Sequence, residues 1–68
     1  MGAATMYILT QEPSGGESAR AFSALDEAYG TEEFTVEEAD KVLAENGFSQ
    51  SMFDSLVANG FVTEADGE

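Results

Sequence analysis

The sequence predicts an α+β fold in which three helices pack against a small antiparallel sheet. One β-branched and aromatic run near the start of the chain is typical of a strand. Three later segments have apolar residues at every third or fourth position, which is the spacing of amphipathic helices. A chain of 68 residues has room for one domain, which we expect to span residues 1–68.

The first predicted element is a strand over residues 5–10, with the sequence Thr-Met-Tyr-Ile-Leu-Thr. Residues 1–4 are small, and we expect them to be frayed. Residues 11–16 contain the single proline and a Ser-Gly-Gly sequence, which indicates a loop.

A helix is predicted over residues 17–29, because apolar residues there recur at a spacing of three to four. They are Ala19, Phe22, Leu25, Ala28 and Tyr29. Gly30 follows directly and suits a left-handed helix end.

A second helix is predicted over residues 36–46, preceded by a short strand at 33–35. Thr35 and Glu38 match a capping box, in which each side chain binds the backbone N–H of the other residue. Phe34 precedes the cap and is expected to pack on Ala39. The helix should stop at an Asn-Gly sequence at 46–47.

A third helix is predicted over residues 49–59, capped by Ser49 or Ser51, and is followed by a strand at 61–64 and a polar tail at 65–68. Both later helices end in Asn-Gly-Phe. Two similar helix ends explain this repeated sequence without an internal structural repeat. The predicted core consists of Tyr7, Leu9, Phe22, Leu25, Tyr29, Phe34, Val42, Leu43, Phe48, Met52, Phe53, Leu56, Phe61 and Val62.

From residue 17 to 64, this order of elements resembles the winged-helix variant of the helix-turn-helix family. The resemblance rests on the Phe34-Thr35 helix entry and on Gly-Phe-Val at 60–62. It implies that helix 49–59 is a recognition helix and that the strand at 33–35 pairs with the strand at 61–64. The implied interaction face consists of Ser49, Gln50, Ser51, Asp54, Ser55 and Ala58.

The chain departs from the family pattern at the wing. Only five residues follow Thr63, so we expect no long wing. Since a two-stranded ribbon alone is marginally stable, the strand at 5–10 is expected to complete the sheet.

The charge balance is strongly acidic, with 14 Asp and Glu against Arg20 and Lys41, for a net charge of −12. Such a charge on a globule of about 11 Å radius of gyration is strongly self-repelling in dilute buffer. The composition therefore indicates a cytosolic protein of an extreme halophile. The alternative is an acidic protein that mimics nucleic acid or binds a basic partner.

Several functional classes are disfavoured by the composition. The chain has no His or Cys, so its serines have no conventional base beside them, and we expect no enzyme, metal site or cofactor. It has no apolar run of about 18 residues and no visible secretory signal. We therefore expect a cytoplasmic protein without membrane contact.

The function predicted from the sequence is a non-catalytic regulatory or adaptor module that binds another protein, as a monomer or homodimer. The alternatives are a DNA-binding transcriptional regulator working at high salt and an acidic nucleic-acid mimic. The net negative charge disfavours DNA binding, since proteins that bind DNA specifically commonly neutralise about 6–10 phosphates. The candidate cationic contacts here are only Arg20 and Lys41.

The halophilic interpretation predicts that the melting temperature rises steadily from low salt to molar KCl. The Debye length falls from ~8 Å at 0.15 M salt to ~3 Å at 1 M, which screens the repulsion between carboxylates. Thermal melts followed by circular dichroism across that range measure the effect. A melting temperature that does not change would favour the acidic-mimic alternative.

Overall fold

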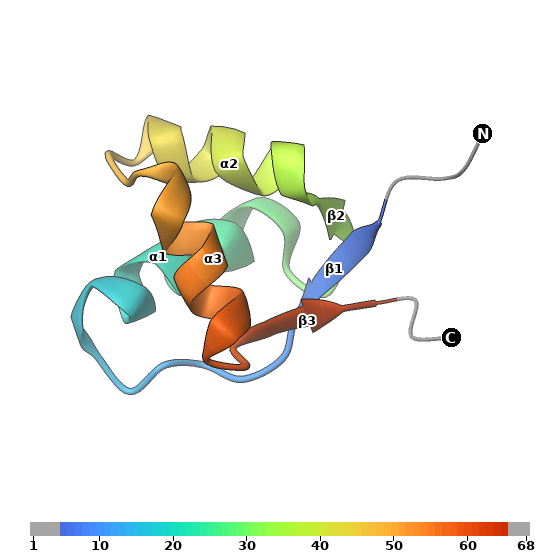
Figure 1. Ribbon diagram of the computed structural model, residues 1–68, viewed down its shortest axis with the longest axis horizontal. Helices are drawn as coiled ribbons and strands as arrows, with labels where there is room; N and C mark the ends of the chain where they lie inside the picture. Colours follow the sequence, from blue (N-terminus) through green and yellow to red (C-terminus); the bar gives the residue numbers. More distant parts are fainter. Residues whose placement is uncertain (1–4, 66–68) are drawn as a thin grey trace.

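The computed structural model describes residues 5–65, and the predictions for residues 1–4 and 66–68 lie outside this part of the chain. Three helices lie on one side of a small sheet (Figure 1). In chain order the elements are β1 (Met6–Leu9), α1 (Gly16–Tyr29), β2 (Phe34–Thr35), α2 (Val36–Glu45), α3 (Gln50–Ala58) and β3 (Val62–Glu64). All six predicted elements are present, and none of their ends differs from the predicted one by more than one residue.

The sheet is antiparallel with the strand order β2-β1-β3, so β1 is the central strand. Tyr7 pairs with Phe34 on β2, and Leu9 pairs with Val62 on β3. The pairing implied for residues 33–35 and 61–64 is therefore wrong, because β1 lies between them. The apolar run of β1 is longer than β2 and supplies backbone partners to both neighbours, which is why the N-terminal strand takes the middle position.

The core lies between the helices and the inner face of the sheet. Half of the predicted core is buried: Phe22, Leu25, Phe34, Leu43, Phe53, Leu56 and Val62. The other predicted members are half-buried and pack against this cluster: Tyr7, Leu9, Tyr29, Val42, Phe48, Met52 and Phe61. Ala21 and Ala39 are also fully buried, because small side chains on α1 and α2 let these helices approach the core closely.

The entry to α2 has the predicted capping box. The Glu38 backbone N–H donates to Thr35 Oγ1 at 3.1 Å, and the Thr35 N–H donates to Glu38 Oε1 at 2.9 Å. Tyr29 stacks on Phe34 with ring centroids 5.1 Å apart, and its hydroxyl donates to the Glu38 carbonyl at 3.3 Å. These contacts tie the end of α1 to the start of α2.

The two later helices end in the same way. The Phe48 N–H donates to the Leu43 carbonyl at 2.8 Å, and the Phe61 N–H donates to the Leu56 carbonyl at 3.0 Å. Between these partners the chain turns at a glycine of positive φ, 88° at position 47 and 80° at position 60. Two Schellman-type ends therefore account for the repeated Asn-Gly-Phe sequence.

Replacing Thr35 by Ala should lower the free energy of unfolding by about 1 kcal/mol, because one side of the capping box is lost. Thr31→Ala is the matched control, since Thr31 is exposed in the turn before β2. Urea unfolding of both variants measures the difference. Equal stabilities would show that the cap contributes little.

Phe53→Ala should cost about 3–5 kcal/mol, because Phe53 is 3% exposed and its ring meets Tyr7 edge-on at 5.1 Å. That is a large share of the stability available to a small domain. Val36→Ala provides the control, because Val36 is 39% exposed and its truncation should change stability little. A Phe53→Ala protein that melts like the parent would contradict the observed packing.

Candidate functional site

Helix α3 presents the predicted interaction face to solvent. Its inner side is anchored by Phe53 and Leu56, which are buried, while Met52 and Val57 pack at the edges of the core. The 3.6-residue period then turns the remaining positions outward. All six predicted residues of the face are exposed: Ser49, Gln50, Ser51, Asp54, Ser55 and Ala58.

The geometry of α2 and α3 is set by a short connection. Residues 46–49 join the two helices, and the end of α2 is closed by the Phe48 N–H bond to the Leu43 carbonyl. A turn of this length is typical of helix-turn-helix units. Figure 1 shows α3 in front of α1, so the α3 face is not covered by another described element.

Gln50 is held by a residue that sequence reasoning missed. Its Nε2 donates to Oδ2 of Asp40 on α2 at 3.3 Å. The other carboxylate oxygen of Asp40, Oδ1, is buried without a hydrogen-bond partner among the described residues. Asp40 directly follows the buried Ala39, and that position at the border of the apolar stripe is the signal that could have identified it.

The serines of the face are already partly engaged. Neither predicted serine cap forms: Ser49 occupies the N-cap position of α3 without a side-chain capping hydrogen bond, and Ser51 lies inside the helix. The two hydroxyls bind each other at 2.8 Å. At the other end, Asn59 Nδ2 donates to the Ser55 carbonyl at 2.8 Å. The face therefore presents short polar side chains that are ordered by local hydrogen bonds.

Charge is distributed very unevenly over the surface. Among the nine residues of α3, Asp54 is the only charged one. In contrast, residues 26–38 hold six exposed carboxylates: Asp26, Glu27, Glu32, Glu33, Glu37 and Glu38. The α3 face is thus nearly neutral on a strongly acidic molecule.

The two candidate cationic contacts do not join the α3 face. Arg20 lies on α1 and Lys41 on α2, and both are exposed. Neither forms an ion pair within 4.0 Å in the part of the chain that the structure describes. The structure therefore places the two candidate cationic contacts on α1 and α2, apart from the α3 face.

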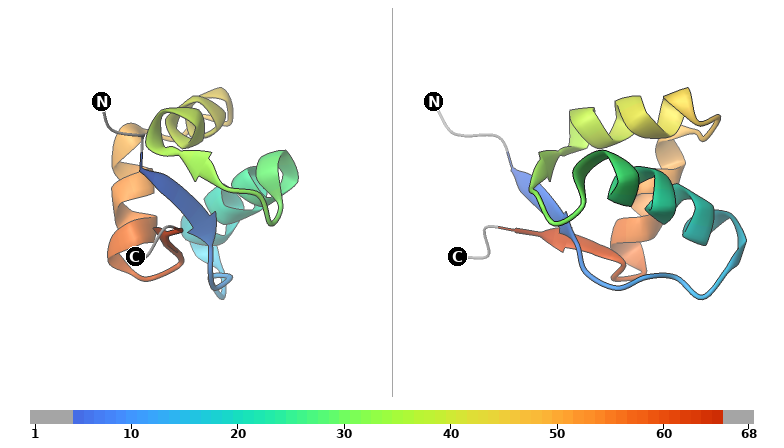
Figure 2. Two further views of the ribbon diagram at one scale, coloured as in Figure 1. Left: turned by 90° about the vertical axis from the view of Figure 1, so that its right-hand side faces the viewer. Right: turned by 180° about the vertical axis from the view of Figure 1, so that it is seen from behind.

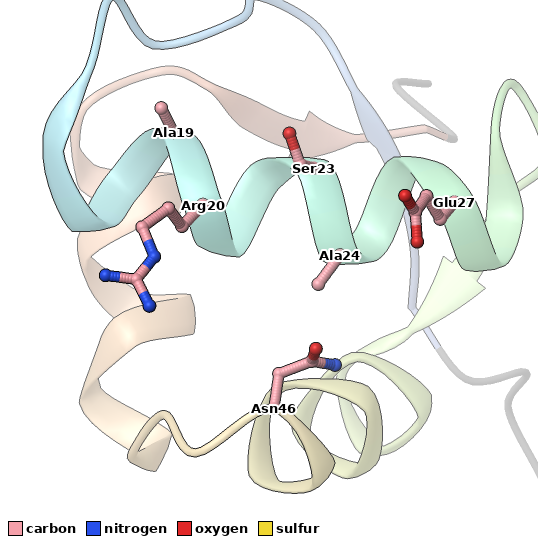
Figure 3. A pocket seen from close by; sticks show the side chains of 6 residues that line it. All are labelled: Ala19, Arg20, Ser23, Ala24, Glu27 and Asn46. Atoms are coloured by element: carbon pink, nitrogen blue, oxygen red, sulfur yellow. The ribbon is translucent and has the colours of Figure 1, made fainter.

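Arg20 instead borders a groove of about 320 Å³ between α1 and the end of α2. Figure 3 shows Asn46 pointing across this groove toward α1, with Arg20 at one end and Glu27 at the other. Asn46 Nδ2 donates to the Val42 carbonyl at 2.8 Å, which leaves the amide oxygen available to the groove. Sequence reasoning missed this groove, because it needs two helices to form it.

A metal site and a membrane-spanning helix each have requirements that can be compared with residues 5–65. No group of three or more acidic side chains there is arranged to hold a metal ion. Within the same residues, none of the helices has the length and apolar character needed to cross a membrane.

Comparison with known proteins adds no assignment to this geometry. The chain matches no protein-family model, and neither a curated protein nor a solved structure matches it.

Proposed function

We propose that this protein is a non-catalytic regulatory or adaptor module of helix-turn-helix type that binds another protein through the outward face of α3. The observation that carries the proposal is the low charge of that face. Its six residues are exposed and include one carboxylate, whereas the whole chain has a net charge of −12. The proposal includes a cytoplasmic location, which the composition predicts.

The physical basis is the cost of removing charges from water. Burying a carboxylate in an interface is costly unless a cation and hydrogen bonds compensate it. Removing hydroxyl and amide groups from water costs less free energy. Hydrogen bonds from the partner then compensate this cost. Gln50 and Ser55 are also held by local bonds, so less side-chain entropy is lost on binding.

A DNA-binding regulator working at high salt is the second candidate. The short connection from α2 to α3 favours it, since α3 then stands as a recognition helix would. Against it, α3 carries no Lys or Arg, and its one charged side chain, Asp54, would repel phosphates. Glu37 and Glu38 in the first turn of α2 add to this repulsion.

Replacing both Gln50 and Asp54 by Lys tests the proposal. The double substitution adds three units of positive charge to the α3 face and should abolish protein binding, while giving weak DNA binding that does not depend on sequence. Partner capture and DNA gel retardation, both in molar KCl, measure the two effects. Melting curves should match the parent, because both positions are exposed.

The matched control replaces Glu12 and Ser14 by Lys, which changes the charge equally in the exposed loop between β1 and α1. This control should retain the partner captured by the parent. Loss of the partner in both double variants would attribute binding to overall charge instead of the α3 face. Tight, sequence-dependent DNA retardation by the parent would replace our proposal with the regulator alternative.

A further inference from the structure

The outward side of α1 carries charges of opposite sign at its two ends. Arg20 and Glu27 are both exposed and are separated by about 10.5 Å along the helix axis, at 1.5 Å per residue. Figure 3 shows the Arg20 guanidinium directed away from the Glu27 carboxylate, so the two do not neutralise each other. Between them lie the small side chains of Ser23 and Ala24, which line the same groove.

This side of α1 faces away from its buried side and borders the groove beside Asn46. Ala21, Phe22 and Leu25 face the core, and the helical period places positions 20, 23, 24 and 27 on the other side. In the view of Figure 2, right, α1 lies in front of α3, whereas α3 lies in front in Figure 1. A molecule bound along α1 would therefore leave the α3 face free.

The pattern of charges on α1 is self-complementary. If a second α1 packs antiparallel to the first with its two-fold axis between positions 23 and 24, Arg20 lies opposite Glu27 of the second copy. The same operation places Glu27 opposite Arg20 of the second copy, and the small Ser23 and Ala24 meet at the axis. We propose that a second copy of this chain binds along α1 in this antiparallel arrangement, forming a symmetric dimer.

The other carboxylates of α1 do not oppose this register. Glu17 would lie opposite Gly30 of the second copy, so these positions bring no two carboxylates together. Asp26 would lie opposite position 21, which faces the core in each copy. The small residues at the axis allow the helices to approach closely, and the groove beside Asn46 gives room for a side chain of the second copy.

The dimer should be weak and dependent on salt. Helix α1 has 14 residues and is about 21 Å long. A single pair of such helices buries less surface area than a stable complex, which buries about 1,200–2,000 Å². Two chains of net charge −12 also repel each other at low salt. Screening weakens this long-range repulsion more than it weakens two ion pairs in direct contact, so association should be stronger in 1 M than in 0.05 M KCl.

Charge reversal tests the register. Arg20→Glu and Glu27→Arg should each lower the association constant at least about tenfold in 1 M KCl, because each converts both ion pairs of the dimer into like-charge pairs. The double variant R20E/E27R should recover the association of the parent, since every pair is restored with its signs exchanged and the net charge stays at −12. Sedimentation equilibrium over a range of concentrations measures all four proteins.

Two control variants match the charge changes outside α1. Lys41→Glu on α2 changes the net charge as Arg20→Glu does, and Glu64→Arg on β3 changes it as Glu27→Arg does. Both should associate like the parent. A parent that is monomeric at all salt concentrations, or a double variant that stays monomeric while folded, would overturn the proposal.

A covalent trap gives an independent readout. The chain contains no cysteine, so Ser23→Cys introduces a single thiol next to the proposed axis. Mild oxidation in 1 M KCl should link it to the same residue of the second copy. Ser55→Cys, on the α3 face, should remain largely monomeric. A covalent dimer with Ser55→Cys and none with Ser23→Cys would move the interface to α3 and overturn the arrangement along α1.

Discussion

The pairing of β1 with both other strands is the constraint on which this small structure depends. Neither the two residues of β2 nor the three of β3 could form a stable sheet alone, and β1 is the strand that both of them pair with. On its inner face, Tyr7 meets Phe53 of α3 edge-on. The N-terminal strand therefore joins the sheet and positions α3 at the same time.

The core is small and apolar, and the charges are kept at the surface except at the half-buried Asp40, whose Oδ1 is buried. The described residues include no buried polar or charged residue, and the Cα radius of gyration is 11.1 Å, as expected for a compact chain of this length. This small surface carries many carboxylates, which are costly to remove from water. A region with few charges therefore has a lower desolvation cost than the rest of the surface. The α3 face is such a region, which is why we place protein binding there.

The two proposed contacts use opposite sides of the helical layer. The α3 face is short, polar and nearly neutral, whereas the α1 side has one cation and one anion separated by two turns. A dimer formed along α1 would present two α3 faces on its outer sides. Two copies of the α3 face on one dimer would raise the effective affinity for a partner with two matching sites.

Local signals in the sequence determined most of the secondary structure. The capping box of Thr35 and Glu38 and the two Gly-Phe helix ends each depend on neighbours within a few residues, so their hydrogen bonds could be predicted from the sequence. The exposure of the α3 face followed from its helical period. Only the tertiary structure decided the central position of β1, the bond from Gln50 to Asp40 and the groove that Asn46 forms with α1. Each of these joins residues from different elements, and the period of one helix or strand does not specify which neighbour its side chains will meet.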